Sequence, residues 1–132
     1  MPEMKQMQEE LKKIAQTYDT EYKSQQSALQ AKLQKYDAEA ATQTDTENQK
    51  RAKEVQDLTK KIQLYGQEAQ QQLAKREQDL YKPISDKAKK AIADVAKEKG
   101  IQYVLDSSPG RSLIVHDGED LMAAVKAKLG IK

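Results

Sequence analysis

The sequence predicts an α+β protein that is predominantly α: a long antiparallel helical hairpin, or coiled-coil arm, on a small body made of a β-hairpin and helices. Charged residues make up 33% of the 132 residues and aromatic residues only 5%, which is typical of long helices. Apolar residues recur at steps of three and four up to Val95, which predicts amphipathic helices. Beyond Gly100, short apolar runs separated by turn residues predict strands instead.

The first helix is predicted over residues 3–41. Its apolar stripe consists of Met4, Met7, Leu11, Ile14, Tyr18, Tyr22, Leu29, Leu33 and Tyr36, with Gln25 and Ala40 on the same face. Short polar residues then predict a turn near 42–46, because their side chains compete with the helical backbone. Thr44 with Glu47, or Thr46 with Gln49, matches a capping box that starts the second helix.

The second helix has a seam of the same kind and is expected to end at Gly100. Its seam residues are Val55, Leu58, Ile62, Tyr65, Ala69, Leu73, Arg76, Leu80 and Ile84. Two long helices joined by a short turn pack antiparallel. The acidic balance of residues 1–45 and the basic balance of residues 46–100 predict complementary flanks. We assign residues 1–84 to the arm, with Pro83 at the joint to the body.

Residues 85–132 form the predicted body, with the end of the second helix, a β-hairpin over 101–116 and a C-terminal helix over 118–129 that Asp117 caps and Gly130 ends. A two-stranded hairpin is not stable alone in water, so the body is expected to need another strand or another subunit. The candidate residues of the body core or of an oligomer contact are Ile92, Val95, Ile101, Tyr103, Val104, Leu113, Val115, Leu121, Val125 and Leu129.

Chemistry-bearing motifs are scarce. There is no phosphate-binding glycine loop, and the single histidine, His116, stands in a chain without cysteine. A catalytic triad or a His/Cys metal site cannot be assembled from these residues. The acidic group at residues 117–120 lacks the spacing of a calcium loop and fits a helix cap better. We therefore expect no enzyme activity, no cofactor and no metal. No apolar run reaches the length of a membrane span.

Two segments resemble a known family. The run from Ala88 onward, AKKAIADVAKEKGIQYVLDSSPGRSLIVHDGEDLMAAVKAKLGIK, resembles the C-terminal half of Skp/OmpH-family chaperones, and the opening MPEMKQMQEELKKI resembles the start of their first arm helix. The resemblance implies a periplasmic protein made with a signal peptide. It also implies a homotrimer with a β-body and three arms around a cavity, which holds unfolded outer-membrane proteins without ATP.

The chain departs from that family at its start. Family members carry an N-terminal strand before the arm, whereas Met1 and Pro2 lead straight into the helix here. We expect that the signal peptide and the first strand have been removed. Because that strand helps to build the shared body, its absence puts the trimer in doubt for this chain.

The expected function is therefore that of an ATP-independent periplasmic holdase for unfolded outer-membrane proteins. The client-contact candidates are Tyr22, Tyr36, Tyr65, Lys82, Lys87, Lys89 and Lys90. The tyrosines are also ordinary seam residues. The lysines form a basic patch that would suit acidic client segments, anionic lipid or lipopolysaccharide, or would simply be a solvated face.

Two other functions remain open at this point. A structural or adaptor coiled coil with one fixed protein partner would have the same helical pattern. A nucleic-acid or anionic-membrane binder would use the second helix, but a net charge of +2 and the lack of an aromatic reading surface argue against nucleic acid.

Overall fold

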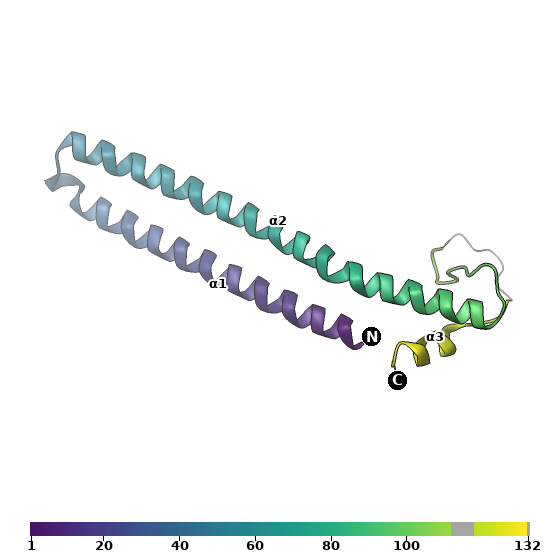
Figure 1. Ribbon diagram of the computed structural model, residues 1–132. Helices are drawn as coiled ribbons and strands as arrows, with labels where there is room; N and C mark the ends of the chain where they lie inside the picture. Colours follow the sequence, from purple (N-terminus) through teal and green to yellow (C-terminus); the bar gives the residue numbers. More distant parts are fainter. Residues whose placement is uncertain (112–117, 132) are drawn as a thin grey trace. The chain divides into compact units, whose positions relative to one another are not determined.

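The computed structural model describes residues 1–111 and 118–131. Two long helices, α1 (Pro2–Glu39) and α2 (Asp45–Glu98), are joined by the 3-10 turn η1 (Ala40–Thr42), and a short helix, α3 (Met122–Lys128), lies near the C-terminus (Figure 1). The predominantly helical part of the predicted fold is confirmed. The chain divides into two compact units, which we call the hairpin unit (residues 9–77) and the terminal unit (residues 1–8 and 78–132). The domain boundary predicted between residues 84 and 85 stays a prediction.

In the hairpin unit, α1 and α2 run antiparallel (Figure 1). Ile62 is buried, and the other seam residues of the unit are largely half-buried. Leu33 is an exception, since it is 40% exposed. The neighbouring Lys32 is half-buried and forms an ion pair with Glu54 of α2. The buried seam of α1 therefore passes from Leu29 to Lys32, a step of three residues. The predicted step of four residues to Leu33 is wrong.

The turn between the two helices occupies residues 40–44. The Oγ1 atom of Thr44 accepts a hydrogen bond from the backbone N–H of Glu47 at 3.2 Å, so Thr44 is the residue that caps α2. The side chain of Asn48 donates to the carbonyl oxygen of Ala40 at 3.0 Å. These bonds satisfy backbone groups that a helix end leaves without intrahelical partners. They also join the end of α1 to the start of α2 across a short turn.

The terminal unit has a more apolar interior. Its buried residues are Met7, Ile84, Ala91, Val95, Ala96 and Leu121. Helix α2 continues through Pro83 without interruption. The helix stops at Gly100, whose φ of 68° suits glycine, and the N–H of Ile101 reaches back to the carbonyl of Ala96 at 2.8 Å.

Gly130 ends α3 in the same way. It has φ 68°, and the N–H of Ile131 donates to the carbonyl of Lys126 at 3.0 Å. Both predicted glycine stops are therefore confirmed.

The first strand of the predicted β-hairpin is not formed. No strand is present in residues 101–111, where Tyr103 is 83% exposed and Val104 is 42% exposed. An alternating apolar pattern favours extended backbone, but a strand also needs a second backbone to receive its hydrogen bonds. The second predicted strand, with Leu113 and Val115, lies outside the described residues.

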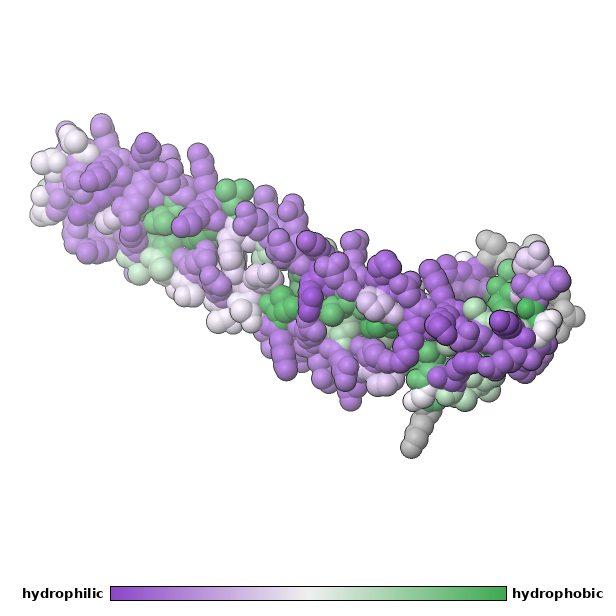
Figure 2. Space-filling view, viewed as in Figure 1, coloured by the Kyte–Doolittle hydropathy of each residue, from purple (hydrophilic) through white to green (hydrophobic). Residues whose placement is uncertain are grey.

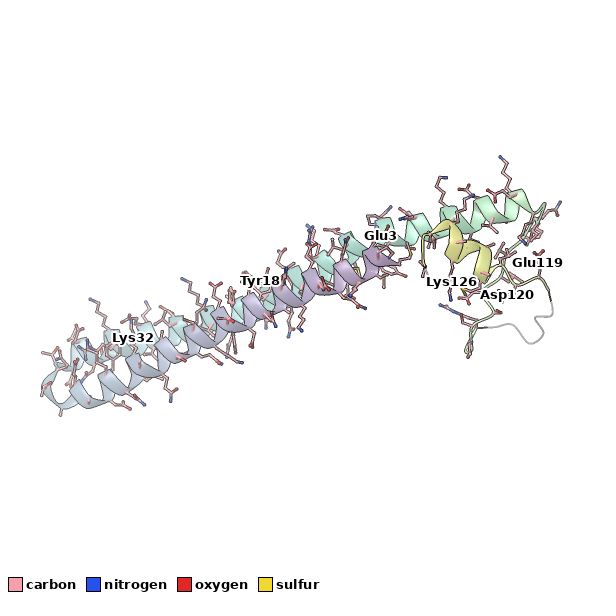
Figure 3. The ribbon with its side chains drawn as sticks, turned by 90° about the horizontal axis from the view of Figure 1, so that it is seen from below. Glu3, Tyr18, Lys32, Glu119, Asp120 and Lys126 are labelled. Atoms are coloured by element: carbon pink, nitrogen blue, oxygen red, sulfur yellow. The ribbon has the colours of Figure 1, made fainter. Side chains whose placement is uncertain are left out.

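The C-terminal helix is shorter than predicted. It begins at Met122 instead of residue 118, and the Oδ1 atom of Asp120 accepts the N–H of Met122 at 2.8 Å. Glu119, labelled beside Asp120 in Figure 3, forms an ion pair with Lys99 of the same unit. Asp120 therefore accepts a hydrogen bond from the first residue of α3. The predicted cap, Asp117, lies outside the described residues. Within the described part of the chain, no helix is long and apolar enough to span a membrane.

Candidate client-contact residues

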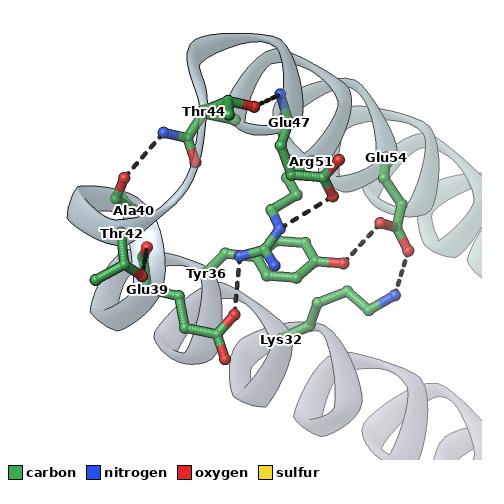
Figure 4. A network of polar contacts seen from close by, with 10 residues as sticks. Lys32, Tyr36, Glu39, Ala40, Thr42, Thr44, Glu47, Arg51 and Glu54 are labelled. Atoms are coloured by element: carbon green, nitrogen blue, oxygen red, sulfur yellow. Dashed lines mark hydrogen bonds and ion pairs between the residues drawn. The ribbon is translucent and has the colours of Figure 1, made fainter.

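Tyr36, the client-contact candidate nearest the turn, lies in a polar cluster between α1 and α2 (Figure 4). The guanidinium carbon of Arg51 lies 4.5 Å from the centroid of its ring, and the Nζ atom of Lys32 lies 5.8 Å from it. Its hydroxyl donates a hydrogen bond to Oε2 of Glu54 at 2.7 Å, while Lys32 pairs with Oε1 of the same carboxylate. Tyr36 thus connects the helices, and the sequence alone did not reveal this role.

The electrostatics of this cluster favour one protonation state. The Lys32 contact, followed by the Tyr36 hydroxyl, lowers the pKa of Glu54 from its ordinary value of 4.5. The same Glu54 contact raises the pKa of Lys32, and the hydrogen bond to Glu54 raises the pKa of Tyr36. The fold therefore favours an ionised Glu54, a charged Lys32 and a neutral Tyr36.

Arg51 is the central cation of the cluster, although the sequence analysis did not single it out. Its Nη1 atom lies 2.9 Å from Oε2 of Glu39 at the end of α1, and its Nε atom lies 3.5 Å from Oε1 of Glu47 in the first turn of α2. The side chain is only 16% exposed. A signal was available, because Arg51 stands four residues before Val55 and extends the seam of α2 toward the turn.

Tyr65 and Tyr22 also face the partner helix. The hydroxyl of Tyr65 donates to Oε2 of Glu21 at 3.0 Å, and its ring meets that of Tyr18 edge-on with centroids 6.2 Å apart. Loss of water contact, followed by this hydrogen bond, raises the pKa of Tyr65. The ring of Tyr22 lies against Gly66, where a Cβ atom would meet Cε2 of the ring at 3.5 Å. All three candidate tyrosines are half-buried, so each has an outer edge in water while its ring contributes to helix packing.

The four candidate lysines belong to the terminal unit and are mostly neutralised. Lys82 pairs with Asp86 and Lys90 with Asp94, each at 2.9 Å, and Lys87 pairs with Glu3. Lys89 has no ion pair with any residue that the structure describes. Their role in client binding stays a prediction, and the predicted basic patch is less positive than its lysines alone suggest.

The candidate body residues differ in exposure. Val95 is 2% exposed and Leu121 is 9% exposed, so both lie in the interior of the terminal unit. Four further candidates are half-buried: Ile92, Ile101, Val125 and Leu129. Tyr103 and Val104 lie in solvent in the single chain. Their predicted role in an oligomer contact stays a prediction.

Polar side chains dominate the visible face of the hairpin unit, and apolar residues show only in limited areas (Figure 2). Tyr18 lies along the middle of α1 and Lys32 nearer to the turn (Figure 3). Among residues 1–111 and 118–131, no group of three or more histidine, cysteine, aspartate or glutamate side chains could hold a metal ion. The described surface is that of a helix pair whose apolar groups are largely engaged between the helices.

A family model described as outer membrane protein (OmpH-like) matches residues 1–129. The chain belongs to the OmpH-like family. The resemblance inferred from the sequence is thereby confirmed. Proteins of the OmpH-like family are in general chaperones of outer-membrane proteins rather than enzymes, and they are associated with the periplasm and the outer membrane. A comparison with curated proteins gave no match.

Proposed function

We propose that this OmpH-like protein is an ATP-independent periplasmic holdase. It binds unfolded outer-membrane proteins in a cavity between helical arms, and it assembles as a homotrimer when the family's N-terminal strand is present. The observation that carries the proposal is the family match over residues 1–129. The antiparallel helix pair of the hairpin unit supports it, because such a pair is the arm of this design.

The outer surface of the helix pair suits weak and distributed binding. Tyr22, Tyr36 and Tyr65 keep one edge in water while their rings are packed between the helices. An apolar client side chain can contact such an edge without displacing the tyrosine from the seam. Each contact is small, so useful affinity requires several contacts at once, as several arms around one client would provide.

Release in this proposal needs no nucleotide. A client that is held by many weak contacts leaves when its own folding or an acceptor offers a lower free energy, because the holdase has only differential affinity to set against that competitor. The exposed apolar residues Tyr103 and Leu105, at 83% and 69% exposure, support the oligomeric part of the proposal. An isolated chain leaves these side chains in water, and a subunit contact would cover them.

Light scattering tests the proposal. A urea-unfolded outer-membrane β-barrel protein is diluted into buffer without ATP, with this protein in excess and with an unrelated helical hairpin of similar charge as the control. The expected result is a marked fall in scattering with this protein alone. Unchanged scattering would reject the holdase function and favour the adaptor coiled coil, which would bind one fixed partner and no unfolded chains.

A further inference from the structure

One face of α2 in the hairpin unit carries a row of lysines, Lys50, Lys53, Lys60 and Lys61, which we call the lysine stripe. All four side chains are exposed. At 3.6 residues per turn they fall within a sector of about 100° around the helix. None of them forms an ion pair with any residue in the described part of the chain.

The carboxylates near the stripe do not cancel its charge. Asp57 lies on the same face, but Glu54 is held toward α1 by the Tyr36 hydroxyl and by Lys32. Between positions 50 and 64, four lysines therefore stand against one uncommitted aspartate, and Glu68, one helical turn beyond Leu64, is the next exposed carboxylate on this face. The shallow depression on this face is lined by Lys50, Lys53, Glu54, Asp57, Leu58 and Lys61. The stripe differs from the lysines at 82, 87 and 90, which are paired with carboxylates.

Leu64 adds an apolar contact at the end of the stripe. It is 57% exposed and is the most exposed large hydrophobic side chain among the residues of the hairpin unit. It lies one helical turn beyond Lys60 and Lys61, on the same face. A partner that reaches along the stripe would therefore meet positive charge first and then one apolar side chain.

We propose that the lysine stripe and Leu64 bind acidic, extended polypeptide segments that carry an apolar side chain beside their carboxylates. The proposal rests on the holdase function, because such a segment would belong to an unfolded client. Lys50 and Leu64 are separated by about 20 Å along the helix axis, at 1.5 Å per residue. An extended chain covers that length with about six residues.

Two other anionic partners fit the face less well. Insertion into a membrane surface needs an apolar helix face, and this face offers a single exposed leucine, Leu64. Single-stranded nucleic acid needs aromatic rings for base stacking. Tyr65, the nearest tyrosine, instead faces α1 and contacts Tyr18 and Glu21.

The test compares two triple variants that remove the same amount of charge. The first is Lys53→Gln/Lys60→Gln/Lys61→Gln on the stripe, and the matched control is Lys12→Gln/Lys13→Gln/Lys35→Gln on α1. Glutamine has nearly the helix propensity of lysine, and circular dichroism verifies the fold. The probe is a fluorescent peptide in which glutamates alternate with leucines and serines, followed by fluorescence anisotropy.

We expect the stripe variant to bind the acidic peptide about tenfold more weakly than the unsubstituted protein, since three exposed charge contacts are lost. The control variant should stay within about twofold. Rising salt should weaken the binding of the unsubstituted protein. Leu64→Ser should weaken binding only of the peptide that contains leucines, and not of a matched peptide in which serines replace them.

Equal weakening in both triple variants would overturn the proposal, because binding would then follow net charge and not the stripe. The proposal would also be overturned if the stripe variant kept its peptide binding but lost binding to phosphatidylglycerol vesicles, because the stripe would then be a lipid contact. A third contrary result would be that the stripe variant binds the peptide fully while the unsubstituted protein suppresses client aggregation. That result would reject the stripe as a binding site and leave the holdase function intact. A stripe-dependent peptide signal without aggregation suppression would reject the holdase function alone.

Discussion

Different interactions stabilise the interiors of the two units. Six of the seven residues that are buried in the described part of the chain belong to the terminal unit, and the seventh, Ile62, is in the hairpin unit. The hairpin unit instead has polar contacts between its helices, among them Arg51 with Glu39 and Arg76 with Glu10. Full burial of an apolar side chain contributes about 2 kcal/mol, whereas an exposed ion pair contributes below about 1 kcal/mol. We therefore expect the hairpin unit to open at lower free energy than the terminal unit.

The largest single effect is expected from a valine-to-alanine substitution made in both units. Val95→Ala in the terminal unit should lower the free energy of unfolding by about 2 kcal/mol, because Val95 is 2% exposed and its removal leaves a cavity. Val55→Ala, at a half-buried seam position, should cost about 1 kcal/mol. Urea unfolding followed by circular dichroism measures both. Equal costs would show that the two interiors do not differ.

Arg51, the cation at the turn, provides a second test of the idea that polar contacts stabilise the hairpin unit. Arg51→Ala should destabilise the hairpin unit by about 1.5 kcal/mol, since it removes the stacking on Tyr36 and the ion pairs with Glu39 and Glu47. Arg76→Ala is the control, because Arg76 is 48% exposed and should cost below about 0.5 kcal/mol. Hydrogen exchange of residues 40–54 should report the loss in the first variant only.

Two glycines give effects of opposite sign. Gly66→Ala should stabilise the hairpin unit by about 0.8 kcal/mol, because the new Cβ atom would meet Cε2 of the Tyr22 ring at 3.5 Å, an ordinary contact, in a helix interior. Gly100→Ala should destabilise the protein by about 1 kcal/mol, since its φ of 68° strains any residue with a Cβ atom. Thermal melts measure both shifts. A destabilised Gly66→Ala variant would mean that the helix pair is packed more tightly at this point than these contacts indicate.

Acid should weaken the polar contacts of the hairpin unit. Lys32 and Tyr36 lower the pKa of Glu54 in the fold, so the unfolded chain binds its proton first. The stabilisation is present above about pH 4.5 and is lost as the pH falls through the lower value of the folded state. Glu54→Gln should flatten the pH dependence of the melting temperature between about pH 5 and 3, and the effect should be small because the pair is near solvent. A pH profile identical to that of the unsubstituted protein would contradict this assignment.

The helices could be predicted because their signals are local and repeated. The seam of α2 from Val55 to Ile84 recurs over eight turns, and Gly100 and Gly130 each supply a backbone conformation that ends a helix. Lys32 was missed because a charged residue in a seam is recognisable only once its partner, Glu54 on the other helix, is known.

The candidate site and the strand depended on partners that the sequence pattern does not reveal. Residues 101–106 have a strand-like composition, but no strand is formed there because composition does not supply a paired backbone. The neutralisation of Lys82 and Lys90 was readable, since Asp86 and Asp94 stand four residues further along the helix. The pairing of Lys87 with Glu3 was not, since 84 positions separate them.

The compact turn has a consequence for how the hairpin forms. Asn48 and Ala40 are 8 positions apart and Arg51 and Glu39 are 12 apart, so the first contacts enclose short loops. Closing a loop costs more entropy as it grows, and a contact such as Glu10 with Arg76, 66 positions apart, is costly if it forms first. Pairing that starts at the turn avoids this cost, because each new layer of the seam extends a loop that is already closed. We therefore expect the pairing of the two helices to begin near residues 39–51.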